Sequence, residues 1–254
     1  DNEIGLVSEV AAGIMILEEI WDEKILETMV GKSVFDLSID FPGIGGKIVQ
    51  IPLRDTTFEI DNKFITNRPD LFSVTGNARE WATIFDENFT NPLPLEATPT
   101  QLSNKMLDVA IESDKCLAYT LLETDNLTAE QSPLAIRMMM ERAGLNPKLD
   151  LVDITNMILA EYGQPMHAFD ADKIVGKISV RMAKNGEKIE ALNDETYELT
   201  DKDLVIADES GPIAIAGVIG GKNSAVSEAT TRVFWESATF EATSVRLTAQ
   251  RHSI

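Results

Sequence analysis

The sequence has few of the residues that form disulfides or bind metals. In 254 residues it has one cysteine, Cys116, and two histidines, His167 and His252. A single cysteine cannot form an internal disulfide, and no second Cys or His lies near it in the sequence to complete a zinc site. We therefore expect a reducing compartment, in which Cys116 serves as a small buried apolar residue.

Long hydrophobic runs are also missing. No apolar stretch approaches the roughly 20 residues that cross a bilayer. The N-terminal DNEIGLVSEV lacks the basic start and apolar core of a secretion signal. We expect a cytoplasmic protein. Because the sequence begins with Asp and stops at RHSI directly after a helical pattern, we expect both ends to be cuts from a longer chain.

Basic residues are scarce. The chain has 22 Lys and Arg against 42 Asp and Glu, a formal net charge of -20. A surface this acidic repels phosphate backbones, whereas nucleic-acid binding usually relies on a basic face. The chain alone is expected to bind nucleic acid weakly, so other domains or subunits would have to hold such a ligand.

The pattern of the remaining residues predicts two regions and a linker. The segment 86–100, DENFTNPLPLEATPT, is rich in proline and small polar residues. It leads us to predict a first domain over residues 1–90, a linker over 91–104 and a second domain over 105–254. Helices and strands occur in blocks rather than in strict alternation, which favours the α+β class.

Helical spacing is present at residues 76–85 and 243–252. A third helix is predicted with Ser132 as its N-cap, Pro133 at its first position and Gly144 past its end. The three methionines of this helix are interpreted as core residues.

The stretch EYGQPMHAFD begins in the last residues of a fourth predicted helix, which Asp153 or Thr155 would cap and which would stop at Gly163. His167 would then lie on a rigid turn just past the helix end. Its local sequence does not separate a functional histidine from a loop or core histidine.

Alternating apolar residues predict strands after Lys177, joined by Asn-Gly, Asn-Asp and Ser-Gly turns. All are expected to share one sheet. The predicted strands are 177–183, 187–192, 196–200, 203–208, 212–221 and 232–240.

Two patterns that suggest ligand sites fail on detail. In GVIGGKNS the gap from Gly217 to Gly221 is one residue short for a phosphate loop, and Asn223 stands where a magnesium-binding Ser or Thr should be. A tight turn explains it better. His167 with Asp170 and Asp172 also falls short of a metal site, because catalytic metals usually take three protein ligands in a known geometry, and only His252 is left to add another imidazole. We predict no metal site.

Glu236 is a carboxylate in an apolar strand. The alternation of VFWESATF puts it on the same face as Phe234 and Ala238. Such a residue is either solvated near a sheet edge or lines a pocket that receives a polar ligand group. The spacing alone leaves both alternatives open.

Four motifs occur in the order found in one family, and together they resemble the β subunit of bacterial phenylalanyl-tRNA synthetase. The start of the chain, IGLVSEVAAG, is similar to the tail of the oligonucleotide-binding-fold insert of that family. The four motifs are ITNRPDLFSVTGNARE, LVDITNMILAEYGQPMHAFD, GPIAIAGVIGG and WESATFEATSVRLTAQRH.

The resemblance implies a small N-terminal α/β structural domain, B1-like, over 1–90, and a larger mixed-sheet B3/B4 editing domain over 105–254, truncated at its C-terminal edge. This editing domain would hydrolyse tyrosine mischarged on phenylalanine tRNA. The implied enzyme is a cytoplasmic heterotetramer in which an α subunit carries the aminoacylation site. ATP and magnesium are implied for the whole enzyme, and no cofactor for this fragment.

The resemblance also implies roles for individual residues. His167 and Asn156 would orient the ester or the hydrolytic water. The substrate-binding residues would be Glu236, Gly217, Gly220 and Gly221. The family pattern continues past Ile254 into a segment that supplies a threonine, and this chain has Ser253 where glycine is usual. Two alternatives remain: a non-catalytic structural or tRNA-contact module, and a freestanding B3/B4-type binding domain.

Overall fold

The computed structural model describes part of the chain in detail. The described residues are 34–36, 50–52, 60, 65, 67–91 and 109–254. Most of the expected N-terminal domain and all but one residue of the predicted linker, 91–104, lie outside them. None of the described helices is long and apolar enough to cross a membrane.

Two compact units make up the structure. The first comprises Asp1–Asn67 and Ser132–Lys148, and the second comprises Arg68–Gln131 and Leu149–Ile254. In the first unit, strands β1 (Val34–Asp36) and β2 (Gln50–Pro52) form an antiparallel pair. This unit also contains helix α4.

The start of helix α4 (Leu134–Arg142) differs from the prediction. Pro133 is the N-cap, with an extended ψ of 143°, and no side chain caps the helix. The extended backbone at Pro133 places the cap one residue after the predicted Ser132. Gly144 follows the helix in the left-handed region, with φ 73°, as predicted. Of the three methionines, Met139 is 50% exposed, so only the other two are buried.

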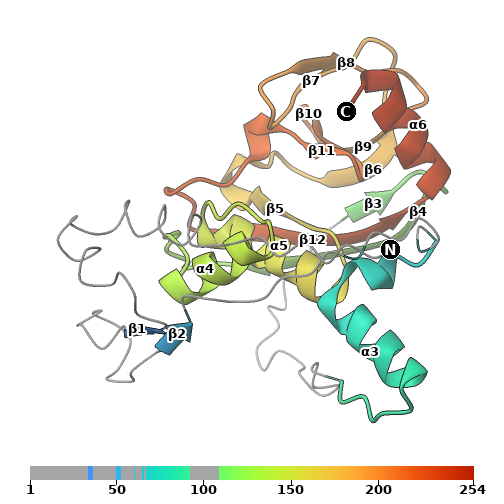
Figure 1. Cartoon of the computed structure of the whole chain (residues 1–254). Helices are drawn as coiled ribbons and strands as arrows, with labels where there is room; N and C mark the ends of the chain where they lie inside the picture. The colour runs from blue at the N-terminus through green and yellow to red at the C-terminus, as the bar shows by residue number, and fades with distance from the viewer. Residues whose placement is uncertain (1–33, 37–49, 53–59, 61–64, 66, 92–108) are drawn as a thin grey trace. The chain divides into compact units, whose positions relative to one another are not determined.

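The second unit contains two main sheets (Figure 1). The five-stranded sheet has the order β11-β10-β9-β6-β3, and only its β3–β6 pair is parallel. Its strands are β3 (Val109–Ile111), β6 (Ile178–Met182), β9 (Leu204–Asp208), β10 (Gly211–Ile215) and β11 (Ile219–Gly220). Strands β7 (Lys188–Glu190) and β8 (Thr196–Glu198) form a separate antiparallel pair.

A three-stranded antiparallel sheet lies against this one, in the order β4-β12-β5. Its strands are β4 (Cys116–Thr124), β12 (Val233–Phe240) and β5 (Met166–Asp170). The prediction that all strands share one sheet is therefore wrong. Neither β4 nor β5 was predicted, and these two strands pair with β12 and hold it in a second sheet. The α+β class is confirmed for this unit.

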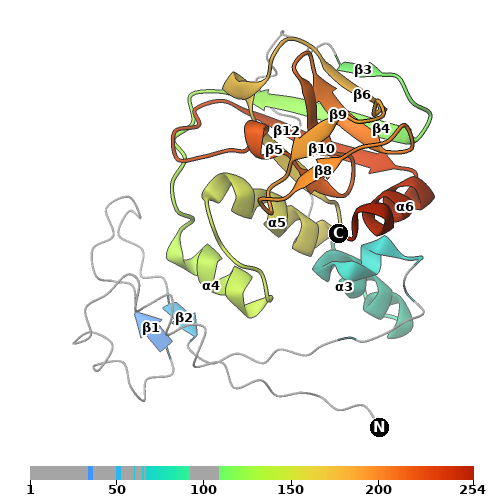
Figure 2. The same ribbon diagram turned by 90° about the horizontal axis from the view of Figure 1, so that it is seen from above.

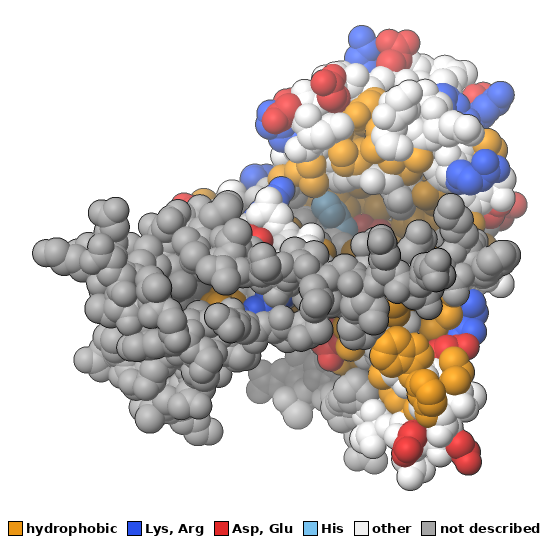
Figure 3. All heavy atoms as spheres, in the orientation of Figure 1, with side chains coloured by type: hydrophobic (Ala, Val, Ile, Leu, Met, Phe, Trp, Pro, Cys, Tyr) orange, Lys and Arg blue, Asp and Glu red, His pale blue; other side chains and the backbone are white. Residues whose placement is uncertain are grey.

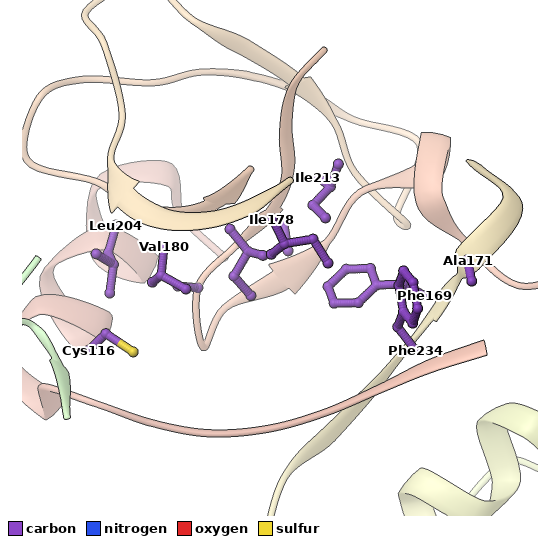
Figure 4. Packing of buried hydrophobic residues seen from close by; sticks show 11 residues of the cluster. Cys116, Phe169, Ala171, Ile178, Val180, Leu204, Ile213 and Phe234 are labelled. Carbon is purple, nitrogen blue, oxygen red and sulfur yellow. The ribbon is translucent and has the colours of Figure 1, made fainter. Parts of the chain in front are cut away.

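The main core fills the space between the two sheets (Figure 4). Phe169 of β5 and Phe234 of β12 point toward Ile178, Val180 and Ile213 of the opposite sheet. Cys116 is buried in the same cluster, as predicted. The face of β12 that carries Phe234 and Glu236 is thus an interior face.

Helix α5 (Asp150–Tyr162) covers the other face of the three-stranded sheet (Figures 1 and 2). Its Leu151 packs with Ala168 and Val233. The helix begins earlier than predicted, so Asp153 and Thr155 lie inside it rather than cap it. The N-cap is Leu149, whose backbone is extended, and no side chain caps the helix.

The end of α5 corrects the predicted surroundings of His167. Gly163 ends the helix in the left-handed conformation, with φ 76°, as predicted. The chain then enters β5 almost at once, and His167 is the second residue of that strand. His167 therefore lies in a sheet rather than on a turn, because β5 pairs with β12 along its whole length.

Two further helices complete the second unit. Helix α3 (Val74–Ile84) begins at Ser73, whose hydroxyl accepts from the Gly76 amide at 3.0 Å. Large hydrophobic side chains are exposed on and beside it (Figure 3). Helix α6 (Ala242–His252) follows β12 directly, close to the prediction of 243–252.

Candidate functional site

A pocket of about 760 Å³ lies where the two sheets meet α6 and the loop before β5. All of its lining residues belong to the second unit. Most of the lining is apolar, and includes Ile206, Ala214, Ile215, Val218, Ile219, Ala238, Phe240 and Val245. The polar side chains that reach it include His167, Glu236, Gln164 and Arg246.

His167 and Glu236 are neighbours in this lining. They are direct partners in the antiparallel register of β5 and β12. Directly opposite residues of an antiparallel pair project from the same face, with Cβ atoms about 4.5–5.5 Å apart. The register thus brings together two titratable side chains that are far apart in sequence.

Glu236 is a buried carboxyl group, with 5% of its surface exposed. Burial penalises the charged form and raises its pKa from 4.5 to about 8. Among the described residues, no side chain or amide donates a hydrogen bond to it. Of the two alternatives left open by the sequence, the pocket position is therefore correct, and the group is neutral at pH 7.

His167 is also neutral at pH 7, because burial lowers its pKa from 6.5 to about 4. Its ring stands edge-on to Phe169, with centroids 4.5 Å apart. Its Nε2 atom is buried and has no hydrogen-bond partner in the described part of the chain. The imidazole thus offers an unused polar atom beside an apolar pocket.

Two glycines allow the walls of this pocket to approach one another closely. A Cβ atom at Gly220 would lie 2.5 Å from Cε1 of His167, so the imidazole fits only against a residue without a side chain. Gly217 has a φ of 70°, and a Cβ there would lie 2.9 Å from Val245. Both line the pocket. In this structure they make room for the protein's own side chains.

Gly221 does not line the pocket. Its amide donates to the carbonyl of Ile213 at 2.7 Å, and a Cβ would lie 2.5 Å from that same oxygen. It therefore holds β10 and the following turn together.

A comparison with known protein families matches the part of the chain that contains this pocket. The family model described as "B3/4 domain" matches residues 115–254, which include the whole pocket except Pro69. The chain belongs to the B3/4 domain family.

Relatives place this B3/4 domain in a particular kind of subunit. The chain is 48% identical over 199 residues to the phenylalanine-tRNA ligase β subunit of Solibacter usitatus, covering 77% of this chain and 25% of that protein. It is 37% identical over 236 residues to the same subunit of Latilactobacillus sakei, covering 90% of this chain and 29% of that protein. The resemblance found from the motifs is confirmed. The chain spans less than a third of these relatives.

Asn156 is not brought to the pocket of this B3/4 domain. It lies half-buried on α5, the helix that covers the opposite face of the three-stranded sheet. It is not among the pocket-lining residues of the described chain. The structure therefore joins His167, Glu236, Gly217 and Gly220 but leaves Asn156 apart from them.

Asp170, which was considered beside His167 as a metal ligand, forms hydrogen bonds within the fold. Asp170 and His167 point to opposite faces of β5, because they are three residues apart in a strand. The Asp170 carboxylate accepts from the Thr230 hydroxyl at 2.8 Å and from the Asp172 amide at 3.1 Å. The described residues include no group of three potential metal ligands.

The sequence analysis missed the wall that α6 gives to the pocket. Ala242, Val245 and Arg246 line it, at the i, i+3 and i+4 spacing of one helix face. This spacing is readable in the sequence. What the sequence does not contain is the direction in which that face points.

The far end of α6 is anchored by a buried carboxylate. Asp203 is fully buried and bonds to Arg251 and, at 3.1 Å, to Nε2 of His252. It also accepts from the amide and hydroxyl of Thr200. Burial alone would raise the pKa of Asp203, but these hydrogen bonds and the Arg251 charge together lower it. The anchor fixes the helix that forms one pocket wall.

Proposed function

We propose that this chain is the editing region of a phenylalanine-tRNA ligase β subunit, and that it hydrolyses tyrosine wrongly esterified to phenylalanine tRNA. The similarity to β subunits supports the setting. The single observation that carries the activity is a carboxyl group, Glu236, buried beside an imidazole in an apolar pocket.

The chemistry explains why such a site is needed. An apolar pocket that selects phenylalanine penalises the extra hydroxyl of tyrosine by only about a hundredfold. A second site must therefore remove the errors, and it must favour the side chain with the hydroxyl.

Glu236 has the properties of the residue that makes this choice. Either protonation state of its carboxyl group offers an oxygen that accepts a hydrogen bond from the tyrosine hydroxyl. Phenylalanine would cover the same group without giving it a partner. A buried polar group left unpaired costs about 1–3 kcal/mol. The residue is thus proposed to set specificity and not to break the ester.

His167 is proposed to position the ester or the attacking water. With a pKa near 4, it is a weak base at neutral pH, and its neutral ring has one donor and one acceptor nitrogen. Fixed geometry of this kind contributes to hydrolysis by orienting the reacting groups. The orienting role that the resemblance implies for Asn156 stays a proposal. It would require that helix α5, or the side chain of Asn156, move toward the pocket.

The rest of the enzyme would supply what this chain does not. An α subunit would carry aminoacylation with ATP and magnesium, and other domains would hold most of the tRNA. The net charge of -20 supports this division, because an acidic surface does not attract a polyanion.

The test compares Glu236→Ala with wild type in the assembled synthetase. Deacylation of tyrosyl-tRNA and of phenylalanyl-tRNA is measured separately, along with aminoacylation. We expect the preference for tyrosyl-tRNA to shrink about tenfold to a hundredfold while aminoacylation is unchanged. Glu195→Ala, at an exposed site outside the pocket, is the control.

Two outcomes would contradict the proposal. An unchanged ratio of the two deacylation rates would show that Glu236 does not read the hydroxyl. A wild-type synthetase that leaves tyrosyl-tRNA intact would favour a structural or tRNA-contact module.

A further inference from the structure

The proposed function assigns no role to Arg246, one of the residues that line the pocket. Arg246 lies in the first half of α6, is exposed to solvent, and lines the same pocket as His167 and Glu236. Among the residues that the structure describes, it is the only lysine or arginine in that lining. The pocket therefore combines an apolar interior with a single permanent positive charge.

Arg246 differs in its surroundings from the other arginines that the structure describes. Every other arginine in the described part of the structure has a hydrogen bond, an ion pair or another interaction with a neighbouring group, for example Arg181 with Glu187 and Arg232 with Glu123. Arg246 has none of these among the described residues. In a protein with 42 acidic residues, a guanidinium that is left unpaired beside a pocket is available to an anionic ligand.

The surroundings favour an anion bound by the side chain rather than by the helix end. The Glu241 carboxylate already accepts from the Ser244 amide at the start of α6, at 2.9 Å. The guanidinium of Arg246 remains free to form two parallel hydrogen bonds, a geometry that matches phosphate oxygens.

We propose that Arg246 binds the 5′-phosphate of the nucleotide whose ribose carries the amino-acid ester. This inference rests on the proposed function. With the amino-acid side chain at Glu236, the ester lies beside His167 and the nucleoside extends along the pocket. A volume of about 760 Å³ is within the range that holds ligands of this size. Arg246 is a binding residue in this arrangement and takes no part in the chemical step.

A matched pair of small substrates tests it in the assembled synthetase. One is the 3′-tyrosyl ester of adenosine, and the other is the 3′-tyrosyl ester of adenosine 5′-monophosphate. They differ only in the phosphate. We expect wild type to hydrolyse the phosphorylated ester with a KM about tenfold lower, the gain typical of one charge-assisted contact.

Arg246→Gln should abolish this difference by raising the KM of the phosphorylated ester to that of the adenosine ester. Arg246→Lys should retain part of it, because the charge stays and the planar fork is lost. Lys202→Gln removes the same charge from an exposed site outside the pocket and should keep the full difference.

The outcomes separate this inference from the function on which it rests. If Arg246→Gln kept the advantage of the phosphorylated ester, or weakened both esters equally, the phosphate role would be wrong and the editing function would stand. If wild type hydrolysed neither ester and also left tyrosyl-tRNA intact, the editing function would fail and the phosphate role with it.

Discussion

Replacing Glu236 by glutamine should make the protein more stable, and increasingly so as the pH rises. The pKa of this carboxyl group is about 8 in the folded chain and 4.5 in its ordinary state. Between these two values the unfolded chain ionises while the folded chain stays protonated. Unfolding then releases a proton, so the free energy of unfolding falls by about 1.4 kcal/mol for each pH unit.

The magnitude follows from the shift. A change from 4.5 to about 8 costs the wild-type protein about 3–5 kcal/mol above pH 8 and nothing well below pH 4.5. Glutamine has the same size and carries no charge at any pH. The free energy of unfolding of Glu236→Gln minus that of wild type should therefore rise from pH 4.5 to 8 and then level off.

Urea unfolding at a series of pH values from 5 to 9 measures this difference. The fluorescence of Trp235, the neighbour of Glu236 in β12, and circular dichroism would follow the transition. The low pKa of His167 destabilises the folded state only as the pH falls below 6.5, equally in both proteins, so it cancels. Glu195→Gln controls for the loss of a surface carboxylate. A difference that does not change with pH would refute the reasoning.

Two other substitutions test the packing around the pocket. Gly220→Ala places a Cβ 2.5 Å from the His167 ring. We therefore expect the free energy of unfolding to fall by about 1–3 kcal/mol and the deacylation of tyrosyl-tRNA to be at least tenfold slower. A wild-type deacylation rate would show that the position of the ring is unimportant. Asp203→Asn leaves Arg251 and His252 without their buried carboxylate, and thermal unfolding should show a loss of about 3 kcal/mol at pH 7. Because the pKa of Asp203 is lowered on folding, this loss should shrink as the pH falls below about 4, and a constant loss would contradict the charge-based explanation.

Local sequence rules were enough for the elements with strong local signals. The end of α5 at Gly163 and the turn at Gly186 were predictable, because both need a positive φ that glycine adopts without strain. Helix α6 and strand β12 were predictable from their periods of 3.6 and 2. The same alternation in β12 was sufficient to place Glu236 on the face of Phe234.

The tertiary structure alone decided what that face meets. Strands β4 and β5 were not predicted, because strand formation there depends on pairing with β12, which follows much later in the chain. Only that register sets His167 opposite Glu236. A shift of one residue in either strand would move the side chain of that strand to the opposite face and separate the two groups, since side chains alternate along a strand. Whether Glu236 is solvated or buried likewise depends on the second sheet that covers it. Local propensity does not depend on a sheet that is distant in the sequence. The sequence therefore supplied the two side chains, and the fold placed them in a desolvated pocket that favours their neutral forms.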